Sequence, residues 1–450
     1  MATPGAAAAA REMSSSPKNK RPMEADPSSR EEQVQAKRGG PRREEAPALL
    51  PMPAGSARFV NYSKWINAKA ERKRREAELG LTPPVEEAQV PPTLEDFEPP
   101  TTFHKKRLLH VRESGTMAVL TAAKSLLGVS SSVGGKPLKR CSGFWIDWDE
   151  ESKTGTVLTT AHLIRTKEAP TNIWSGGEEY DPHANVTVHL LDGTSAEGQL
   201  LYHQPHYDVA FVRVRVDKPV QLPSFNEEVK LVQDVFRLGR DNMLDLRITY
   251  GRAVSENPDT CQRYHDMCFH CAGVPNNEEK YDGGGPVIDL EGKVVGMSNV
   301  RCTRTFIPSS ILLKCLDLWK KYEYKYIPRP HLGMTFEAIK LLEPAHVDKI
   351  WRMYNIDNGL VVQKVSKGSH AEKFGIQIGD IIECCNGESV STTVKLENML
   401  MSICKGSSDN LNGLNVEVNV SVEVFHTLKK LRTVGELAAD VSDHGEVIIA

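Results

Sequence analysis

Short apolar runs separated by turn residues are the feature that most constrains the fold of this chain. Between residues 105 and 320, the runs Val-Thr-Val-His-Leu-Leu-Asp-Gly, Asp-Val-Ala-Phe-Val-Arg-Val-Arg-Val and Val-Val-Gly-Met-Ser-Asn-Val are rich in β-branched side chains and are bounded or interrupted by Gly, Asp or Asn. β-Branched side chains fit a pleated strand, and turn signals at this spacing are typical of an all-β barrel or sandwich. The segment is therefore predicted to be mainly β, not an alternating βαβ fold.

A second pattern begins near residue 328 and continues to about residue 435. The strand-like run Asn358–Val365 is followed by a short helical stretch, Ser369–Gly375, and residues 416–424 alternate apolar and polar side chains with a period of two. Successive side chains of a strand point to opposite faces, so this alternation predicts a strand with one buried face. We expect a smaller domain over residues 328–435, followed by an acidic tail over residues 436–450.

Residues 1–104 form an extension of different composition. Residues 1 to about 60 are rich in Ala, Pro, Ser, Arg and Glu, and they hold too few large apolar side chains to offset the entropy lost on folding, so they are predicted to be disordered. One helix is expected over residues 63–79, with Ser63 as N-cap and Gly80 as the stop signal. Residues 81–100 are acidic and proline-rich, which is typical of a stiff linker.

Basic clusters recur in this extension, and the strongest is Arg72–Arg75 at the centre of the expected helix. Such a cluster is either a solvated helix face with salt bridges or a nuclear localisation signal. The second interpretation predicts a nuclear protein, with the cytoplasm as the alternative. Aromatic residues do not interleave with the basic run after Trp65, so binding of nucleic acid is not predicted.

Composition argues against a membrane protein and against a disulfide-rich secreted protein. The chain holds no uninterrupted apolar run long enough to cross a bilayer, so no membrane partner is predicted. Its nine cysteines are an odd number without a framework spacing, which favours free thiols in a reducing compartment. The formal net charge of -3 is too small to indicate a charged partner.

Three motifs follow one another in the order that chymotrypsin-like hydrolases use. His162 lies in Thr-Ala-His after an apolar strand, Asp208 lies in His-Tyr-Asp-Val-Ala about 45 residues later, and a glycine-rich turn spans Tyr281–Pro286. This chemistry needs a general base, a carboxylate that orients it, and a nucleophile. A lone histidine on an apolar strand more often packs in a core, and a strand aspartate more often marks a turn or an edge. The shared order and spacing favour the catalytic interpretation.

These motifs resemble the HtrA/Deg family of trypsin-like serine proteases. Ser142-Gly143-Phe144 resembles the strand before the family's histidine motif, and the segment from Val287 to Met297 resembles the hairpin after its nucleophile. The resemblance implies a chymotrypsin-like double β-barrel followed by a PDZ domain. It also places His162 at the base position and Asp208 at the orienting position. Gly283 falls at the nucleophile position, and Tyr281 and Gly283 at the oxyanion-hole position.

Two departures from the family pattern bear directly on catalysis. Gly283 stands where the family has serine, so it supplies no attacking hydroxyl, and loss of such a serine costs on the order of 10⁶-fold in turnover. Tyr281 replaces a glycine whose N–H is an oxyanion-hole donor and whose backbone geometry disfavours a bulky residue. The sequence therefore predicts a proteolytically inactive homologue that acts as a protein- or peptide-binding regulator or a chaperone-like module. The alternative is an active serine-type endopeptidase in protein quality control with an unrecognised nucleophile.

The second domain resembles the PDZ domains of the same family. Leu332, Gly333 and Met334 match the loop that presents backbone N–H groups to a peptide's C-terminal carboxylate, while Ala371–Ile382 matches the short helix and Gly-Asp turn that follow. The resemblance implies protein or peptide ligands with apolar C-termini. It also raises a homo-oligomer, such as a trimer, as an expectation. The chain's own apolar end, Val447–Ala450, is a candidate occupant of the groove.

A cluster of potential metal ligands lies just before the glycine-rich turn. It comprises Cys261, His265, Cys268, His270 and Cys271. Cys-x-x-Cys with nearby histidines is able to bind zinc. However, the segment aligns with a buried strand of the HtrA/Deg family, and on a strand Cys268 and Cys271 point to opposite sides. The strand interpretation is favoured, so no metal and no cofactor are predicted.

Overall fold

The computed structural model describes residues 71, 74–75, 108–167, 179–256, 269–272, 282–299, 304–406, 414, 416–445 and 448. The chain divides into two compact units, Met1–Asp96 and Phe97–Ala450, and every element described below belongs to the second unit. Of the helix expected over residues 63–79, only Glu71, Arg74 and Arg75 are among the described residues, and they are helical and exposed. The rest of the extension predicted over residues 1–104, apart from these three residues, lies outside the described residues.

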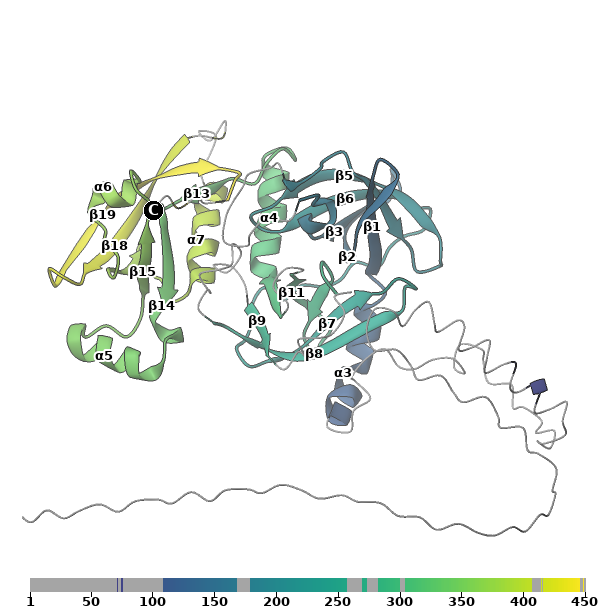
Figure 1. Ribbon diagram of the computed structural model, residues 1–450, viewed down its shortest axis with the longest axis horizontal. Helices are drawn as coiled ribbons and strands as arrows, with labels where there is room; N and C mark the ends of the chain where they lie inside the picture. The colour runs from purple at the N-terminus through teal and green to yellow at the C-terminus, as the bar shows by residue number, and fades with distance from the viewer. Residues whose placement is uncertain are drawn as a thin grey trace, which may run out of the picture. The chain divides into compact units, whose positions relative to one another are not determined.

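Six strands close the first barrel (Figure 1). They are β1 (Leu126–Val133), β2 (Lys136–Asp149), β3 (Thr154–Thr159), β4 (Asn185–His189), β5 (Ser195–Gln204) and β6 (Val209–Arg215), in the order β1-β2-β3-β6-β5-β4. Inward-facing aliphatic side chains such as Val157, Val188 and Val212 are fully buried in its core. A short 3₁₀ helix, η3 (Ala161–Ile164), follows β3 directly and carries His162.

Another six strands close a second barrel. They are β7 (Asp234–Arg240), β8 (Leu246–Val254), β9 (Phe269–Ala272), β10 (Pro286–Ile288), β11 (Val294–Ser298) and β12 (Thr305–Pro308), in the order β10-β11-β12-β9-β8-β7. Helices α3 (Leu109–Ala122) and α4 (Ser309–Lys321) share one apolar core with both barrels, and Trp319 of α4 stacks on Phe211 of β6 with ring centroids 4.3 Å apart. The predicted chymotrypsin-like double barrel is confirmed.

The C-terminal domain is one twisted sheet with helices packed on it, and the predicted PDZ fold is confirmed. Its strands are β13 (Arg329–His331), β14 (Met334–Ala338), β15 (Leu360–Val365), β16 (Ile381–Cys385), β17 (Glu388–Ser389), β18 (Val416–His426) and β19 (Leu431–Ser442). Its helices are α5 (Pro344–Tyr354), α6 (His370–Phe374) and α7 (Thr393–Gly406), with a 3₁₀ turn η6 (Ile339–Leu341). The main strand order is β13-β19-β18-β16-β15-β14, so β14 forms one edge of the sheet, and α5 and α6 lie at opposite ends of it (Figure 1).

The last strand extends past the boundary expected at residue 435. β19 continues to Ser442, so the first half of the segment predicted as an acidic tail is part of the sheet. Leu437 and Val441 are fully buried, whereas Glu436 and Asp440 are exposed. The acidic residues lie on the solvent-exposed face of the strand and alternate with buried apolar residues. In the sequence, this acidic face resembles a charged tail.

Helix α4 packs beside α7 and binds the carbonyl groups at the end of that helix. The Lys321 ammonium donates to the carbonyl oxygens of Cys404 and Lys405 at 3.2 and 2.7 Å, and the Tyr322 hydroxyl donates to that of Cys404 at 2.9 Å. The last carbonyls of a helix have no partner within it, and cations are favourable there. These bonds join the PDZ domain to the peptidase domain.

A buried carboxylate on α7 forms a second connection between the two domains. Glu397 is 2% exposed and accepts hydrogen bonds from Arg329 Nε at 2.8 Å, Arg329 Nη2 at 3.0 Å and the Tyr207 hydroxyl at 2.8 Å. Burial by itself favours the neutral acid, but the Arg329 guanidinium and the His206 imidazole more than offset it and hold the pKa of Glu397 well below its ordinary value.

We expect this carboxylate to make stability depend on pH. Because the pKa of Glu397 is lower in the folded than in the unfolded chain, its contribution is present above the ordinary carboxyl pKa of about 4.3 and is lost as the pH falls below that value. Glu397→Gln should lower stability at pH 7 by about 3 kcal/mol, since it leaves Arg329 buried without its charge partner. Urea unfolding followed by tryptophan fluorescence, at neutral pH and at pH values below about 4.3, tests both effects.

Asp317→Asn provides the control, because it removes an exposed ion pair between α4 and α7, Asp317 with Lys405 at 2.6 Å. Exposed ion pairs contribute little to stability, so this variant should have about the same stability as the unmodified protein at each pH. The prediction is contradicted if Glu397→Gln has the same free energy of unfolding as the unmodified protein at neutral pH and loses the same amount of it in acid.

Candidate functional site

Asp208 is bound to the turn that carries His162. Its Oδ1 accepts a hydrogen bond from the Thr160 hydroxyl at 2.7 Å and another from the His162 backbone N–H at 3.2 Å. Its carbonyl oxygen accepts from the Ala161 N–H at 3.2 Å. Asp208 is 2% exposed and adopts a left-handed backbone with φ +48°. The orienting position and the base position are thus brought together by side-chain and backbone bonds.

Thr160 is hydrogen-bonded to both Asp208 and His162. It is fully buried and is the N-cap of η3, so its hydroxyl oxygen accepts from the His162 N–H at 3.0 Å while its proton goes to Asp208. A threonine at an N-cap satisfies one of the orphan N–H groups of the helix that follows. Sequence alone does not reveal this role of Thr160, although it is the first residue of the Thr-Ala-His motif.

The glycine-rich segment forms a tight turn at the start of β10. The Gly285 N–H donates to the Asp282 carbonyl at 2.8 Å, and Gly284 adopts φ +76°. The carbonyl oxygen of Gly283 accepts from the Ser142 N–H of β2 at 2.9 Å. Gly283 is buried and is not among the described residues with positive φ, so a side chain at this position would meet no left-handed strain.

An ion pair between Asp282 and a buried arginine fixes this turn to the second barrel. Arg237 of β7 is 4% exposed, and its Nε lies 2.9 Å from Asp282 Oδ2. The same Nε donates to the Ser298 hydroxyl of β11 at 3.2 Å. Sequence alone does not predict this role of Arg237, because nothing in a strand pattern tells which distant carboxylate a buried arginine will meet.

The turn lies directly against the segment before His162. A Cβ placed on Gly284 would lie 2.5 Å from the Ser142 carbonyl oxygen and 3.0 Å from the Thr160 backbone nitrogen, so only glycine fits. The structure therefore brings three predicted site residues, His162, Asp208 and Gly283, to one junction between the barrels. Tyr281, the fourth, lies outside the described residues.

The thiols around this junction are poor candidates for a replacement nucleophile. Cys141 is 4% exposed, its Sγ lies 3.2 Å from the Thr159 hydroxyl, and burial raises the pKa of its thiol to about 12. Cys271 on β9 is fully buried, and burial raises its pKa to about 12 as well. The thiolate is the reactive form, so both groups are suited to packing and not to attack.

The predicted metal-ligand cluster is described only in part. Phe269–Ala272 forms β9, and Cys271 packs in the second barrel core beside Val235 and Val287. Cys261, His265 and Cys268 lie outside the described residues.

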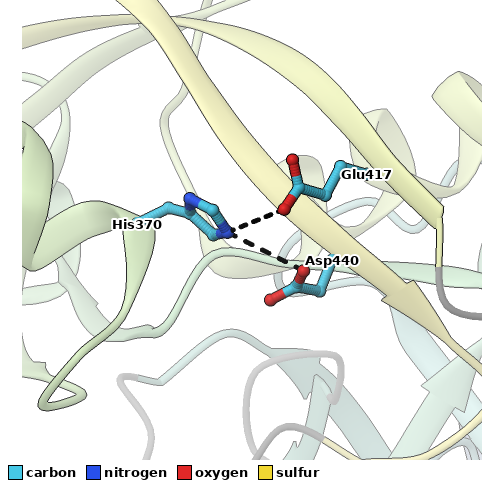
Figure 2. Close-up of side chains that lie close together, drawn as sticks. All are labelled: His370, Glu417 and Asp440. Carbon is cyan, nitrogen blue, oxygen red and sulfur yellow. Dashed lines mark ion pairs between the residues drawn. The ribbon is translucent and has the colours of Figure 1, made fainter.

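A different group of charged residues meets on the PDZ domain, where the imidazole of His370 faces two carboxylates (Figure 2). His370 Nε2 lies 3.5 Å from Glu417 Oε1 and 3.7 Å from Asp440 Oδ1, and the two acidic residues are direct partners across β18 and β19. Like charges directly opposite one another destabilise a sheet, and the imidazole offsets them when protonated. Three ligands, two of them on exposed carboxylates, fall short of the four that a structural zinc site needs.

The predicted peptide-binding residues form the loop between β13 and β14. Leu332 is 4% exposed, and Gly333 adopts φ +71° with its carbonyl oxygen accepting from the Ser366 N–H at 2.7 Å. Met334 begins β14, which pairs with β15 on one side and ends the sheet on the other, close to α7. An edge strand of this kind is able to accept a further strand by main-chain hydrogen bonds.

Comparison with known proteins agrees with this architecture. A trypsin-like peptidase domain model matches residues 141–297, and a PDZ domain model matches residues 339–417. The chain is similar to the human serine protease HTRA3, with 24% identity over 301 residues that cover 63% of this chain and 62% of that protein. It is also similar to the serine protease Do-like HtrA of Bacillus subtilis, with 21% identity over 300 residues that cover 62% of each chain.

These matches cover less than two thirds of the relatives' own length. Among solved structures, an HtrA-type protease AlgW with tripeptide aligns over 73% of this chain and 96% of its own, with 16% identity and a TM-score of 0.47. The two matched domains define a trypsin-like peptidase fold joined to a PDZ domain. Across both domains the chain is similar to serine proteases of the HtrA/DegP family. Within the part of the chain that the structure describes, no helix has both the length and the apolar character of a membrane span.

The close fit of the turn predicts a strong effect of Gly285→Ala. The new methyl group would overlap the Leu238 carbonyl oxygen, and a backbone atom cannot rotate away, so we expect a loss of about 1–3 kcal/mol in stability. Gly368→Ala is the control, because Gly368 has φ +77° but no neighbour within 4 Å of the added atom, and only backbone strain of about 1 kcal/mol applies. Urea unfolding compares the two variants, and a Gly285→Ala protein more stable than Gly368→Ala would contradict the packing argument.

Proposed function

We propose that this chain is a proteolytically inactive member of the HtrA/DegP family. It would act as a protein- or peptide-binding regulator or a chaperone-like module. The observation that carries the proposal is Gly283 in the turn that packs beside Thr160. An acyl-enzyme needs an oxygen or sulfur nucleophile at this point, and glycine provides neither.

The other groups around the turn support the same conclusion. The Thr160 hydroxyl is committed to Asp208 and to the His162 N–H, and the Ser142 hydroxyl accepts from the Arg240 N–H at 2.8 Å. The buried Cys141 thiol is held in its protonated form, because burial raises its pKa to about 12. Retention of His162 and Asp208 is explained by packing, since their contacts join η3 to the start of β6.

Hydrolysis of unfolded casein tests the absence of catalysis. We expect the purified chain to show no inhibitor-sensitive cleavage, because loss of the nucleophile costs on the order of 10⁶-fold in turnover. The control is His162→Ala, which should leave any background rate unchanged. Robust cleavage by the unmodified chain that is lost in His162→Ala would overturn the proposal and favour an active endopeptidase.

Gly283→Ser, treated with a fluorophosphonate probe, shows how much of the catalytic apparatus remains. Labelling of this variant but not of the unmodified chain is the expected result if His162 and Asp208 still activate a hydroxyl at this position. Labelling of the unmodified chain would reveal another nucleophile, and peptide mapping by mass spectrometry would locate it.

We also propose that the edge of β14 next to α7 binds peptides with apolar C-termini. The support is the outer edge of β14 next to the Leu332–Met334 loop, whose backbone N–H groups would receive the terminal carboxylate. Leu396 and Leu400 of α7 are buried in the core of this domain and keep the helix in place beside the sheet.

Fluorescence anisotropy with a labelled peptide that ends in valine tests this proposal. We expect the free acid to bind at least about tenfold more tightly than the same peptide with a C-terminal amide, a difference of about 1.4 kcal/mol. Gly333→Ala should weaken binding, because its Cβ would lie 2.6 Å from Ser369 Cβ and displace the loop. Equal binding of acid and amide would contradict carboxylate recognition.

A further inference from the structure

The two residues before Asp208 are held by the PDZ domain. Tyr207 is fully buried, and its hydroxyl donates to Glu397 Oε1 on α7 at 2.8 Å. The His206 ring packs edge-on against the Tyr207 ring with centroids 4.8 Å apart, and its Nε2 lies 3.7 Å from the same carboxylate oxygen. The chain therefore enters Asp208 from a segment whose side chains are fixed by another domain.

The position of Glu397 is itself set within the PDZ domain. Arg329 of β13 binds both of its carboxylate oxygens, at 2.8 and 3.0 Å, and β13 is held in the sheet by pairing of Arg329 with Ser442 of β19. Two parallel N–H to oxygen bonds fix the orientation of a carboxylate as well as its position. Glu397 is thus a rigid anchor and not a mobile surface acid.

Asp208 needs such an anchor because its backbone is strained. Its φ of +48° lies in the left-handed region, which aspartate adopts more readily than most residues but which persists only where the surroundings hold it. On its C-terminal side Asp208 continues into β6, and on its N-terminal side the fixed neighbour is Tyr207. A change at Tyr207 would alter the peptide plane that leads into Asp208.

We propose that Glu397 is a positioning residue for the peptidase site: through Tyr207 it holds the backbone of Asp208, and so fixes the carboxylate beside His162. Asp208 Oδ1 accepts hydrogen bonds from the Thr160 hydroxyl and the His162 N–H. A shift of Asp208 would therefore change the position and surroundings of His162. This positioning does not depend on whether the chain cleaves peptides, and it goes beyond the function proposed above.

NMR of the full-length protein with ¹³C-labelled histidine tests the proposal, with the His162 peak assigned from His162→Ala. Tyr207→Phe keeps the ring and removes only the hydroxyl, and we expect it to shift the His162 peak and to change the pH at which that peak titrates. Tyr322→Phe is the matched control, because the Tyr322 hydroxyl also crosses to α7, donating to the Cys404 carbonyl at 2.9 Å, but is not adjacent to Asp208.

A shift of the His162 peak in Tyr207→Phe and not in Tyr322→Phe supports the proposal. An unchanged peak in both variants, or the same shift in both, overturns it, since a merely structural contact would act equally from either tyrosine. Glu397→Gln and its combination with Tyr207→Phe give a second measurement. If Glu397 acts through Tyr207, the double variant shifts the peak no further than Glu397→Gln alone, whereas additive shifts contradict the pathway.

Discussion

The backbone contact between the glycine-rich turn and the segment before His162 is the constraint on which the site depends. The two barrels meet where Gly284 lies against Ser142 and Thr160, and no Cβ fits between them. The hydrogen bond from Ser142 to the Gly283 carbonyl and the ion pair of Asp282 with Arg237 hold the turn in this place. The geometry of a hydrolase is therefore maintained by packing and backbone bonds, independently of any nucleophile.

The contacts that hold the rest of the site in place also do not depend on a nucleophile. Thr160, His162 and Asp208 form a connected set of hydrogen bonds that joins η3 to the start of β6. Removing one of them leaves buried polar groups without partners, which is costly whether or not the site is catalytic. Gly283 contributes no side chain to this set, and its carbonyl oxygen accepts a hydrogen bond from the Ser142 N–H.

Specific hydrogen bonds, some of them buried, join the PDZ domain to the peptidase domain. Lys321 and Tyr322 bind the end of α7, and Glu397 is buried with Arg329 and Tyr207. A buried ion pair contributes little net stability compared with an apolar core, but it is expensive to break and it specifies one arrangement. The position of α7 relative to β13 is thereby fixed as well.

Much of this architecture was predictable from the sequence, because short β-branched runs and their turn residues carry a local signal. The runs around His162 and Asp208, the strict alternation of residues 416–424 and the Gly-Asp turn near Asp380 each indicated the elements that the structure contains. The end of β19 could not be recognised in the sequence, because Glu436 and Asp440 alternate there with the buried residues Leu437 and Val441. An acidic solvent face looks the same in sequence as an acidic tail.

Sequence by itself determined the residue types at the site, above all the glycine at position 283, since the identity of a residue does not depend on the fold. Only the tertiary structure decided that Glu397 of the PDZ domain meets Tyr207, 190 residues earlier in the chain. A helical stripe that includes Glu397, Met401 and Cys404 indicates a buried charge, but the partner of a buried charge depends on which surfaces pack together. Long-range packing, and not any local pattern, linked the PDZ domain to the residue beside Asp208.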